Sequence, residues 1–211
     1  MDAHLRAGIA IHNAGEHHAA HDAWEDHWLD LDAGTDDERF LHGLIQFTAA
    51  VHHGFEGNWA GLRGLAESAG EYLDGLPSPY RGVDLDRVRA YLAALADDPE
   101  HVERVDVPAI TYEGRALSLA DLADGADFEA AAVAAAVLAD EFDAYDEDVI
   151  GAGVDYARES VTASEGGRFV ALVFDFVAGE ERDLVYQRLR EHVERRRSRE
   201  EDVEGLFDPD Q

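Results

Sequence analysis

The chain has 211 residues, which is long enough to bury one sizeable hydrophobic core. It carries 47 Asp and Glu residues against 17 Lys and Arg, a formal net charge of -30 at pH 7, and it contains no lysine. This charge argues against nucleic acid and against anionic membranes as partners, because both are bound through clusters of basic residues.

Four helices separated by short turns are predicted in the first part of the chain. Gly15 follows the first helix as a C-terminal capping residue, and Thr35 with Glu38 forms a capping box that begins the third helix. The third helix is largely apolar, as a central and mostly buried helix should be. The four predicted helices cover about residues 3–13, 16–31, 35–54 and 59–74.

A proline-rich segment, Leu76–Tyr80, cannot be helical and is the best place to divide the chain. We predict a helical domain over residues 1–78 and an α-rich region over residues 79–211. A small β-hairpin is predicted near residues 106–117, where apolar residues alternate around Glu113-Gly114. Further helices are predicted at about residues 84–97, 127–142, 146–163 and 181–204.

Residues 169–177 combine the signals of two kinds of structure. Their β-branched and aromatic residues favour a strand, but their apolar residues also recur at helical spacing. We predict a helix, because no partner strand is apparent nearby. In the last helix, we expect Leu184, Leu189 and Val193 to face inward.

A weak internal echo supports a repeated architecture. Gly15 and Gly57 each fall between two predicted helices, and each is followed at the same spacing by a glutamate, Glu25 and Glu67. The alternation of helix and short turn predicts an all-α fold of stacked antiparallel helix hairpins, packed as in tetratricopeptide repeats, with the small β-hairpin in the C-terminal half.

The densest group of chemically active side chains lies in the second predicted helix, within residues 13–28. His17, His21 and Glu25 stand at i, i+4 and i+8 and therefore share one helix face. Trp28 lies on an adjoining strip of the same helix. Such a group can bind a ligand, hold a metal or form a satisfied polar seam in a helical core.

The order of the polar residues resembles an uncharacterised protein family, called domain of unknown function three hundred and nine, over about residues 8–75. The resemblance implies an all-α fold of helix hairpins, and it implies no activity. His17 and His18 stand where the family usually has aromatic residues. The positions that carry the resemblance are Gly15, Ala20-His21-Asp22, Glu25, Trp28, Gly43-Leu-Ile-Gln46, His53, Gly57-Asn58 and Gly61.

Gln46 and His53 share a face of the third predicted helix, so they can meet His21 and Glu25 if the two helices pack antiparallel. Three interpretations of this cluster remain open. It is a polar network that fixes the helix register, or a groove beside Trp28 that binds a small ligand or a protein, or a metal site formed by His17, His21, Glu25 and His53. His27 and His42 are predicted on solvated faces.

The leading functional hypothesis is a non-enzymatic helical module that binds a partner or a small ligand at this His/Glu/Trp groove. The alternative is a metal-dependent enzyme, such as a hydrolase, that uses His21, Glu25 and His53. The sequence predicts no resident cofactor and leaves a divalent metal open. The partner is an unidentified small ligand or protein, and a homodimer is a further option.

The cellular location is inferred from what the sequence does not contain. There is no cysteine, and the longest apolar run, Phe169–Phe174, is far too short to span a membrane. We therefore expect a soluble cytoplasmic protein. Because the acidity is spread along the whole chain, we also expect the protein to come from a halophile, where molar salt screens such charge.

Overall fold

A computed structural model describes residues 1–124, 127–163 and 167–206 of the chain. Within these ranges the chain forms eleven helices and one two-stranded antiparallel sheet, which confirms the predicted all-α class with a small hairpin. The elements are α1 (Asp2–Asn13), α2 (His17–Leu29), α3 (Asp36–Phe55), α4 (Trp59–Leu73), α5 (Leu85–Asp97), α6 (His101–Arg104), β1 (Thr111–Tyr112), β2 (Arg115–Ala116), α7 (Leu119–Asp124), α8 (Phe128–Glu141), α9 (Glu147–Ala163), α10 (Arg168–Ala178) and α11 (Arg182–Leu206).

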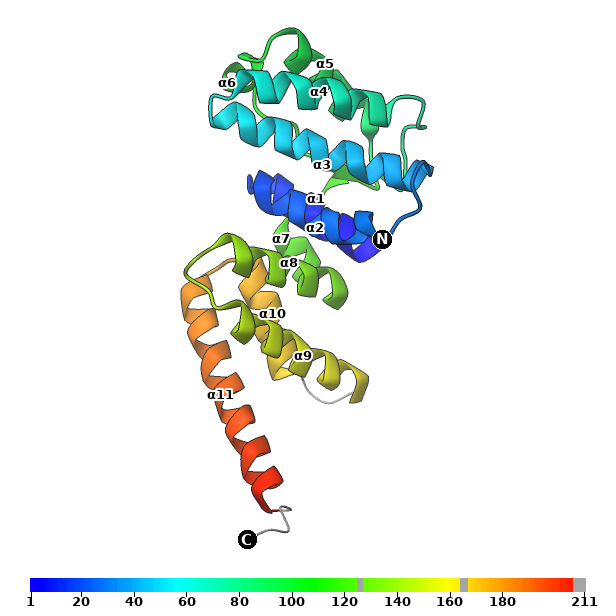
Figure 1. Ribbon diagram of the computed structural model, residues 1–211. Coiled ribbons are helices and arrows are strands. Elements are labelled where there is room, and N and C mark those ends of the chain that lie inside the picture. The colour runs from blue at the N-terminus through cyan, green and yellow to red at the C-terminus, as the bar shows by residue number, and fades with distance from the viewer. Residues whose placement is uncertain (125–126, 164–166, 207–211) are drawn as a thin grey trace.

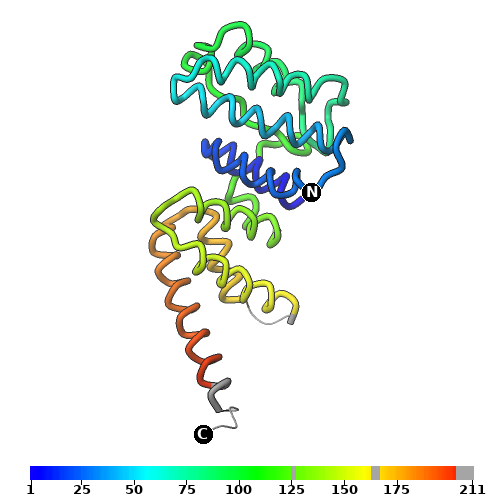
Figure 2. The backbone as a smooth tube through the Cα atoms, in the orientation of Figure 1, coloured from blue at the N-terminus to red at the C-terminus, as the bar shows by residue number. Residues whose placement is uncertain are grey.

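The helices are stacked in layers, as Figure 1 shows. Helices α1 and α2 form the middle layer, with α2 packed against α3 on one side and both helices in contact with α8 on the other. Helices α4 and α5 lie beyond α3, and α9, α10 and α11 lie beyond α8. The trace in Figure 2 shows that α11 extends from the end of the stack opposite to α5. The middle layer therefore joins the two halves of the molecule.

Two glycines make the tight turns of the N-terminal hairpins. Gly15, between α1 and α2, has φ +94°, and Gly57, between α3 and α4, has φ +74°. Residues with a Cβ atom rarely adopt this left-handed conformation, and glycine adopts it without strain. The two turns return the chain antiparallel to the preceding helix, so the stacked hairpins predicted from these glycines are confirmed.

The start of α3 is capped almost as the sequence predicts. The Oγ1 atom of Thr35 accepts a hydrogen bond from the backbone N–H of Glu38 at 3.2 Å. The Glu38 carboxylate, in turn, accepts from the backbone N–H of Gly34 at 3.2 Å, one residue before the cap. These two hydrogen bonds tie the turn at Gly34 to the first turn of α3 and so fix the orientation of α3 relative to α2.

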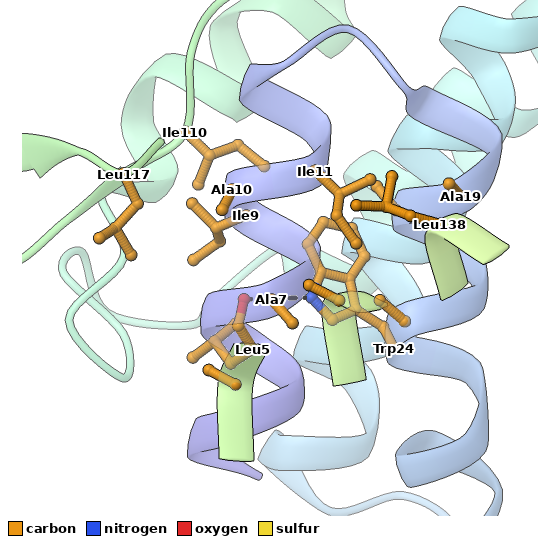
Figure 3. Close-up of a cluster of buried hydrophobic side chains, with 14 of the residues drawn as sticks. Leu5, Ala7, Ile9, Ala10, Ile11, Ala19, Trp24, Ile110, Leu117 and Leu138 are labelled. Carbon is orange, nitrogen blue, oxygen red and sulfur yellow. Dashed lines mark hydrogen bonds between the residues drawn. The ribbon is translucent and has the colours of Figure 1, made fainter. Parts of the chain in front are cut away.

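The middle of the core is built around Trp24, which is fully buried. Figure 3 shows its indole among apolar side chains of α1, α2 and α8, including Ile11, Ala19 and Leu138. The indole Nε1 donates a hydrogen bond to the backbone carbonyl of Leu5 at 3.3 Å. One large side chain therefore fills the space between the helices of the middle layer and α8, with its single polar atom satisfied.

The predicted β-hairpin is present, and it is tied to α1. Its turn residues Glu113 and Gly114 have φ +49° and +81°, the pattern of a type I′ turn. At the end of α1, the Asn13 Nδ2 donates to the backbone carbonyls of Ile110 at 3.0 Å and Leu117 at 2.7 Å, while its Oδ1 accepts from the Ile110 N–H at 2.8 Å. A single amide thus holds both sides of the hairpin against the middle layer.

The last two helices test two predictions about apolar patterns. Residues 169–177 belong to α10, as predicted, and bury Leu172, Val173, Phe176 and Val177. The prediction of which α11 residues face inward was partly wrong. Leu189 and Val193 are buried, but Leu184 is 39% exposed and Val185 is buried in its place. Helix α11 contacts both α9 and α10, so its buried strip is shifted from the one that a single neighbour would select.

The Leu76–Tyr80 segment is non-helical, as predicted from its prolines. Helices α4 and α5, which flank it, pack against each other. The division of the chain at residue 78 stays a prediction. In the described parts of the chain, no helix is both long enough and apolar enough to cross a membrane.

Candidate functional site: a histidine-lined pocket

The hairpin of α2 and α3 collects histidines at one of its ends. Because the two helices run antiparallel, the start of α2 lies beside the end of α3. The first turns of α2 carry His17, His18 and His21, and the last turns of α3 carry His52 and His53. Five of the chain's eleven histidines therefore come together at this end of the hairpin.

A pocket of about 280 Å³ lies between the two sets of histidines. The imidazole rings of His18 and His52 both line it, and they pack together with their centroids 5.3 Å apart. The four imidazoles are open to solvent, from 27% exposed in His21 to 55% in His18. A small molecule can therefore reach imidazole groups from both helices at once. The lining residues are His18, His21, Ala49, His52, His53 and Glu56.

The side chain of His53 is oriented by the cap of the next helix. Asn58 begins α4, where its Oδ1 accepts from the backbone N–H of Gly61 at 3.1 Å. The Asn58 Nδ2 lies 3.1 Å from His53 Nδ1, and since an amide nitrogen can only donate, Nδ1 is the acceptor. The neutral imidazole of His53 then carries its proton on Nε2.

Carboxylates flank the pocket on the side of α8. The Nδ1 of His18 is 2.9 Å from Glu141 Oε2 and 3.6 Å from Asp22 Oδ2. The Nδ1 of His21 is 2.7 Å from Asp22 Oδ1. The hydrogen bond with Glu141 is the main cause that raises the pKa of His18, and it outweighs the opposing effect of burial. Two sets of three residues each place their possible metal-ligand atoms within 4.8 Å of one another. The sets are His18, Asp22 and Glu141, and His21, Asp22 and Glu25.

Behind the pocket, His17 turns away from the solvent and pairs with His12. Their Nδ1 atoms are 3.1 Å apart, and both residues are buried. Burial, reinforced by the neighbouring imidazole, lowers the pKa of His12 to about 3, and burial together with His52 lowers the pKa of His17 to about 4. These two histidines are neutral at physiological pH and form part of the core.

The other end of the hairpin holds a separate polar group around His42. Its ring packs between Trp28 and Tyr72, at centroid distances of 4.5 and 4.0 Å. The Nε2 of His42 lies 3.0 Å from Gln46 Nε2, and Trp28 Nε1 donates to Glu38 Oε1 at 3.0 Å. Burial opposes the ionisation of Glu38, but hydrogen bonds from Trp28, the Gly34 N–H and His42 outweigh it and lower the pKa of Glu38.

The residues predicted for the site are thus divided between these places. His21 and His53 line one pocket, and Glu25 lies within reach of His21 on its α8 side. Trp28 and Gln46 both contact His42 at the other end of the hairpin.

Some residues of these groups were missed or misjudged by sequence reasoning. The prediction that His42 is solvated was wrong, since its side chain is only 19% exposed. His18, His52 and Glu141 were not predicted as site residues. His52 could have been found, because it adjoins His53 on the same helix end, but Glu141 comes from a distant helix.

A comparison with family models finds a match in the N-terminal part of the chain. Residues 5–65 match the family described as Domain of unknown function (DUF309), which confirms the resemblance seen in the sequence. The match runs from within the first turn of α1 to the middle of α4, and it contains every residue that lines the pocket. Glu141, in α8, lies outside it. No curated protein matches the chain.

Proposed function

We propose that the chain is a non-enzymatic binding module whose histidine-lined pocket takes up a small polar ligand. The observation that carries this proposal is that four imidazoles and one carboxylate, contributed by two helices, surround an open space of about 280 Å³. A neutral imidazole offers one donor and one acceptor, so such a lining suits a ligand that carries both kinds of group.

A comparison with two neighbouring histidines supports a binding role over a purely structural one. His12 and His17 show what structural histidines look like in this protein, since they are buried and paired with each other. The side chains of His52 and His53 are 40% and 36% exposed, and they face the pocket from the end of α3. Exposed imidazoles gathered around a pocket contribute little to stability, which favours a role in binding.

The test is a titration of the ¹⁵N-histidine-labelled protein with small carboxylic acids, amines and phosphates in the presence of EDTA. At least one of these probes should shift the imidazole signals of the pocket and leave His101, on α6, unchanged. Ala49→Leu fills the pocket and should abolish the shift. Ala60→Leu, the same change at an exposed site on α4, should not. Failure of every probe to shift the pocket histidines selectively would overturn the proposal.

A metal-dependent hydrolase is the second candidate. One observation favours it: His21 lines the pocket together with His53 and also lies within 4.8 Å of Asp22 and Glu25. Hydrolysis of p-nitrophenyl acetate or p-nitrophenyl phosphate that depends on added Zn²⁺ or Mn²⁺, and that falls on Glu25→Gln, would support this candidate. Activity that is equal in EDTA would reject it.

The setting in which the module works is also a proposal. The acidity of the chain and the lack of cysteine support the cytoplasm of a salt-accumulating organism. A protein partner or a second copy of the chain are further binding options at the same groove.

A further inference from the structure

Asp22 occupies a position that the binding pocket itself does not explain. Its two carboxylate oxygens face two different histidines of α2. Oδ1 lies 2.7 Å from the Nδ1 of His21, and Oδ2 lies 3.6 Å from the Nδ1 of His18. Each histidine also has a second carboxylate within 4.8 Å, Glu141 near His18 and Glu25 near His21.

We propose that Asp22 is the shared ligand of two adjacent divalent-cation sites. The first is completed by His18 and Glu141, and the second by His21 and Glu25. In each set the three ligand atoms lie within 4.8 Å of one another. A carboxylate has two oxygens and can bind one cation with each, so a single aspartate between two histidine–carboxylate pairs is suited to bridging.

The interatomic distances fit cation ligands. Zn²⁺ binds imidazole nitrogen and carboxylate oxygen at about 2.0–2.2 Å, which places neighbouring ligand atoms roughly 3.0–3.5 Å apart. In the first set, His18 Nδ1 is 2.9 Å from Glu141 Oε2 and 3.6 Å from Asp22 Oδ2. These two separations lie close to that range, and the third, between Asp22 and Glu141, is at most 4.8 Å.

The ligand types select the class of cation. Imidazole suits zinc, while carboxylates suit manganese and magnesium, so a mixed set of one histidine and two carboxylates favours Zn²⁺ or Mn²⁺. Asp22 and Glu141 are 29% and 26% exposed, which leaves an entry path and room for water ligands. The formal net charge of -30 also raises the local concentration of cations around the chain.

The first site joins two parts of the fold. His18 and Asp22 belong to α2, whereas Glu141 ends α8, so a cation bound there would link the middle layer to the C-terminal helices. The second site lies within α2 alone. The two sites should therefore be separable by substitution, and binding at the first should stabilise the contact between α2 and α8.

Equilibrium dialysis of the full, EDTA-treated chain against Zn²⁺ or Mn²⁺ tests this inference. The experiment is done in about 1 M KCl, where the Debye length of about 3 Å suppresses diffuse cation binding. Wild type should bind two cations per chain, Asp22→Asn none, and Glu141→Gln and Glu25→Gln one each. Asp30→Asn, the same charge change at an exposed position just after α2, is the control and should bind two.

Circular dichroism should show that each variant is folded. If Asp22→Asn does not fold, the double variant Glu141→Gln with Glu25→Gln replaces it, with the same expected loss of both ions. The inference is overturned if wild type binds fewer than two cations, or if Asp22→Asn retains them. It does not rest on the proposed function, because the ligand titration is run in EDTA and can succeed or fail separately.

Discussion

At the scale of single residues, the pair His12 and His17 links the stability of the core to pH. The His12 ring is 2% exposed, and its Nε2 lies 3.2 Å from the carbonyl oxygen of Pro108. Burial lowers its pKa to about 3, whereas a histidine in an unfolded chain has a pKa of about 6.5. The unfolded chain therefore takes up a proton at a pH where the folded chain does not, and acid favours unfolding.

We predict that the free energy of unfolding decreases as the pH falls below about 6.5, because burial depresses the pKa of His12. The stability is fully present above the unfolded pKa and is lost as the pH falls towards the folded pKa of about 3. Between pH 7 and 5.5, His12 alone should contribute a loss of about 1 kcal/mol. Urea unfolding at constant KCl measures this loss, and His12→Leu should show a shallower pH dependence. Parallel curves for the two proteins would contradict the prediction.

The candidate site shows which residues a sequence can reveal. His21 and Glu25 were predictable because helical spacing fixes neighbours along one helix. The pairing of His21 with His53 followed from an antiparallel hairpin, which the short turn between the helices indicates. Glu141 was not predictable, since it reaches His18 only through the packing of α8 on α2, which no local pattern encodes.

At the scale of helices, the contact between α1 and α2 depends on the absence of one side chain. A Cβ atom on Gly8, in α1, would lie 2.1 Å from the Nε1 of Trp24, in α2. Trp24 is fully buried and cannot move aside without disturbing its neighbours. Gly8 therefore allows the indole to lie directly against the backbone of α1.

We expect Gly8→Ala to lower the free energy of unfolding by about 1–3 kcal/mol through overpacking, although alanine is the better helix former. Gly64→Ala is the matched control. Gly64 is exposed in α4 and a Cβ atom there meets nothing within 4 Å, so this change should stabilise the protein by about 0.5–1 kcal/mol. Thermal unfolding of both variants measures the difference. Equal effects of the two changes would refute the role given to Gly8.

Asn13 carries the link between α1 and the β-hairpin. Asn13→Ala leaves the Ile110 N–H and two backbone carbonyls without their partner, and it should cost about 1–3 kcal/mol. Asn13→Asp should cost at least as much, because its carboxylate would face the two carbonyls. Gln187→Ala, which removes an exposed amide from α11, should change the stability by less than about 0.5 kcal/mol. Denaturant unfolding compares the three, and a harmless Asn13→Ala would disprove the link.

Most helices were predictable because their ends carry local signals. Capping residues such as Thr35 and Asp84 accept hydrogen bonds from the first turn of α3 and α5, as their sequence positions indicate. The four-residue helix α6 was missed, since a single turn has no apolar period to detect. The buried face of α11 was misplaced at Leu184, because two neighbouring helices, not one, decide which residues are covered.

At the scale of the whole molecule, acidic residues are spread along the chain but arginines are not. Helix α11 contains seven of the 17 arginines, and several pair with glutamates one turn away, such as Arg195 with Glu191 and Arg196 with Glu200. The basic run is thus neutralised within its own helix, as expected for a solvated helix face. Helix α11 contains as many acids as arginines, so the excess negative charge lies on the rest of the molecule, where the carboxylates repel one another.

The melting temperature should therefore rise with salt. Between about 0.1 M and 3 M KCl, the Debye length falls from about 10 Å to below about 3 Å, so the mutual repulsion of the carboxylates is screened. If screening recovers several kcal/mol, the midpoint shifts by on the order of 10 °C. Neutralising two exposed acids at the end of α8, Asp140→Asn and Asp143→Asn, should raise the midpoint at about 0.1 M KCl. The same double variant should have little effect at about 3 M, where the repulsion is already screened. A midpoint that stays flat across this range would refute both the electrostatic argument and the expected halophilic origin.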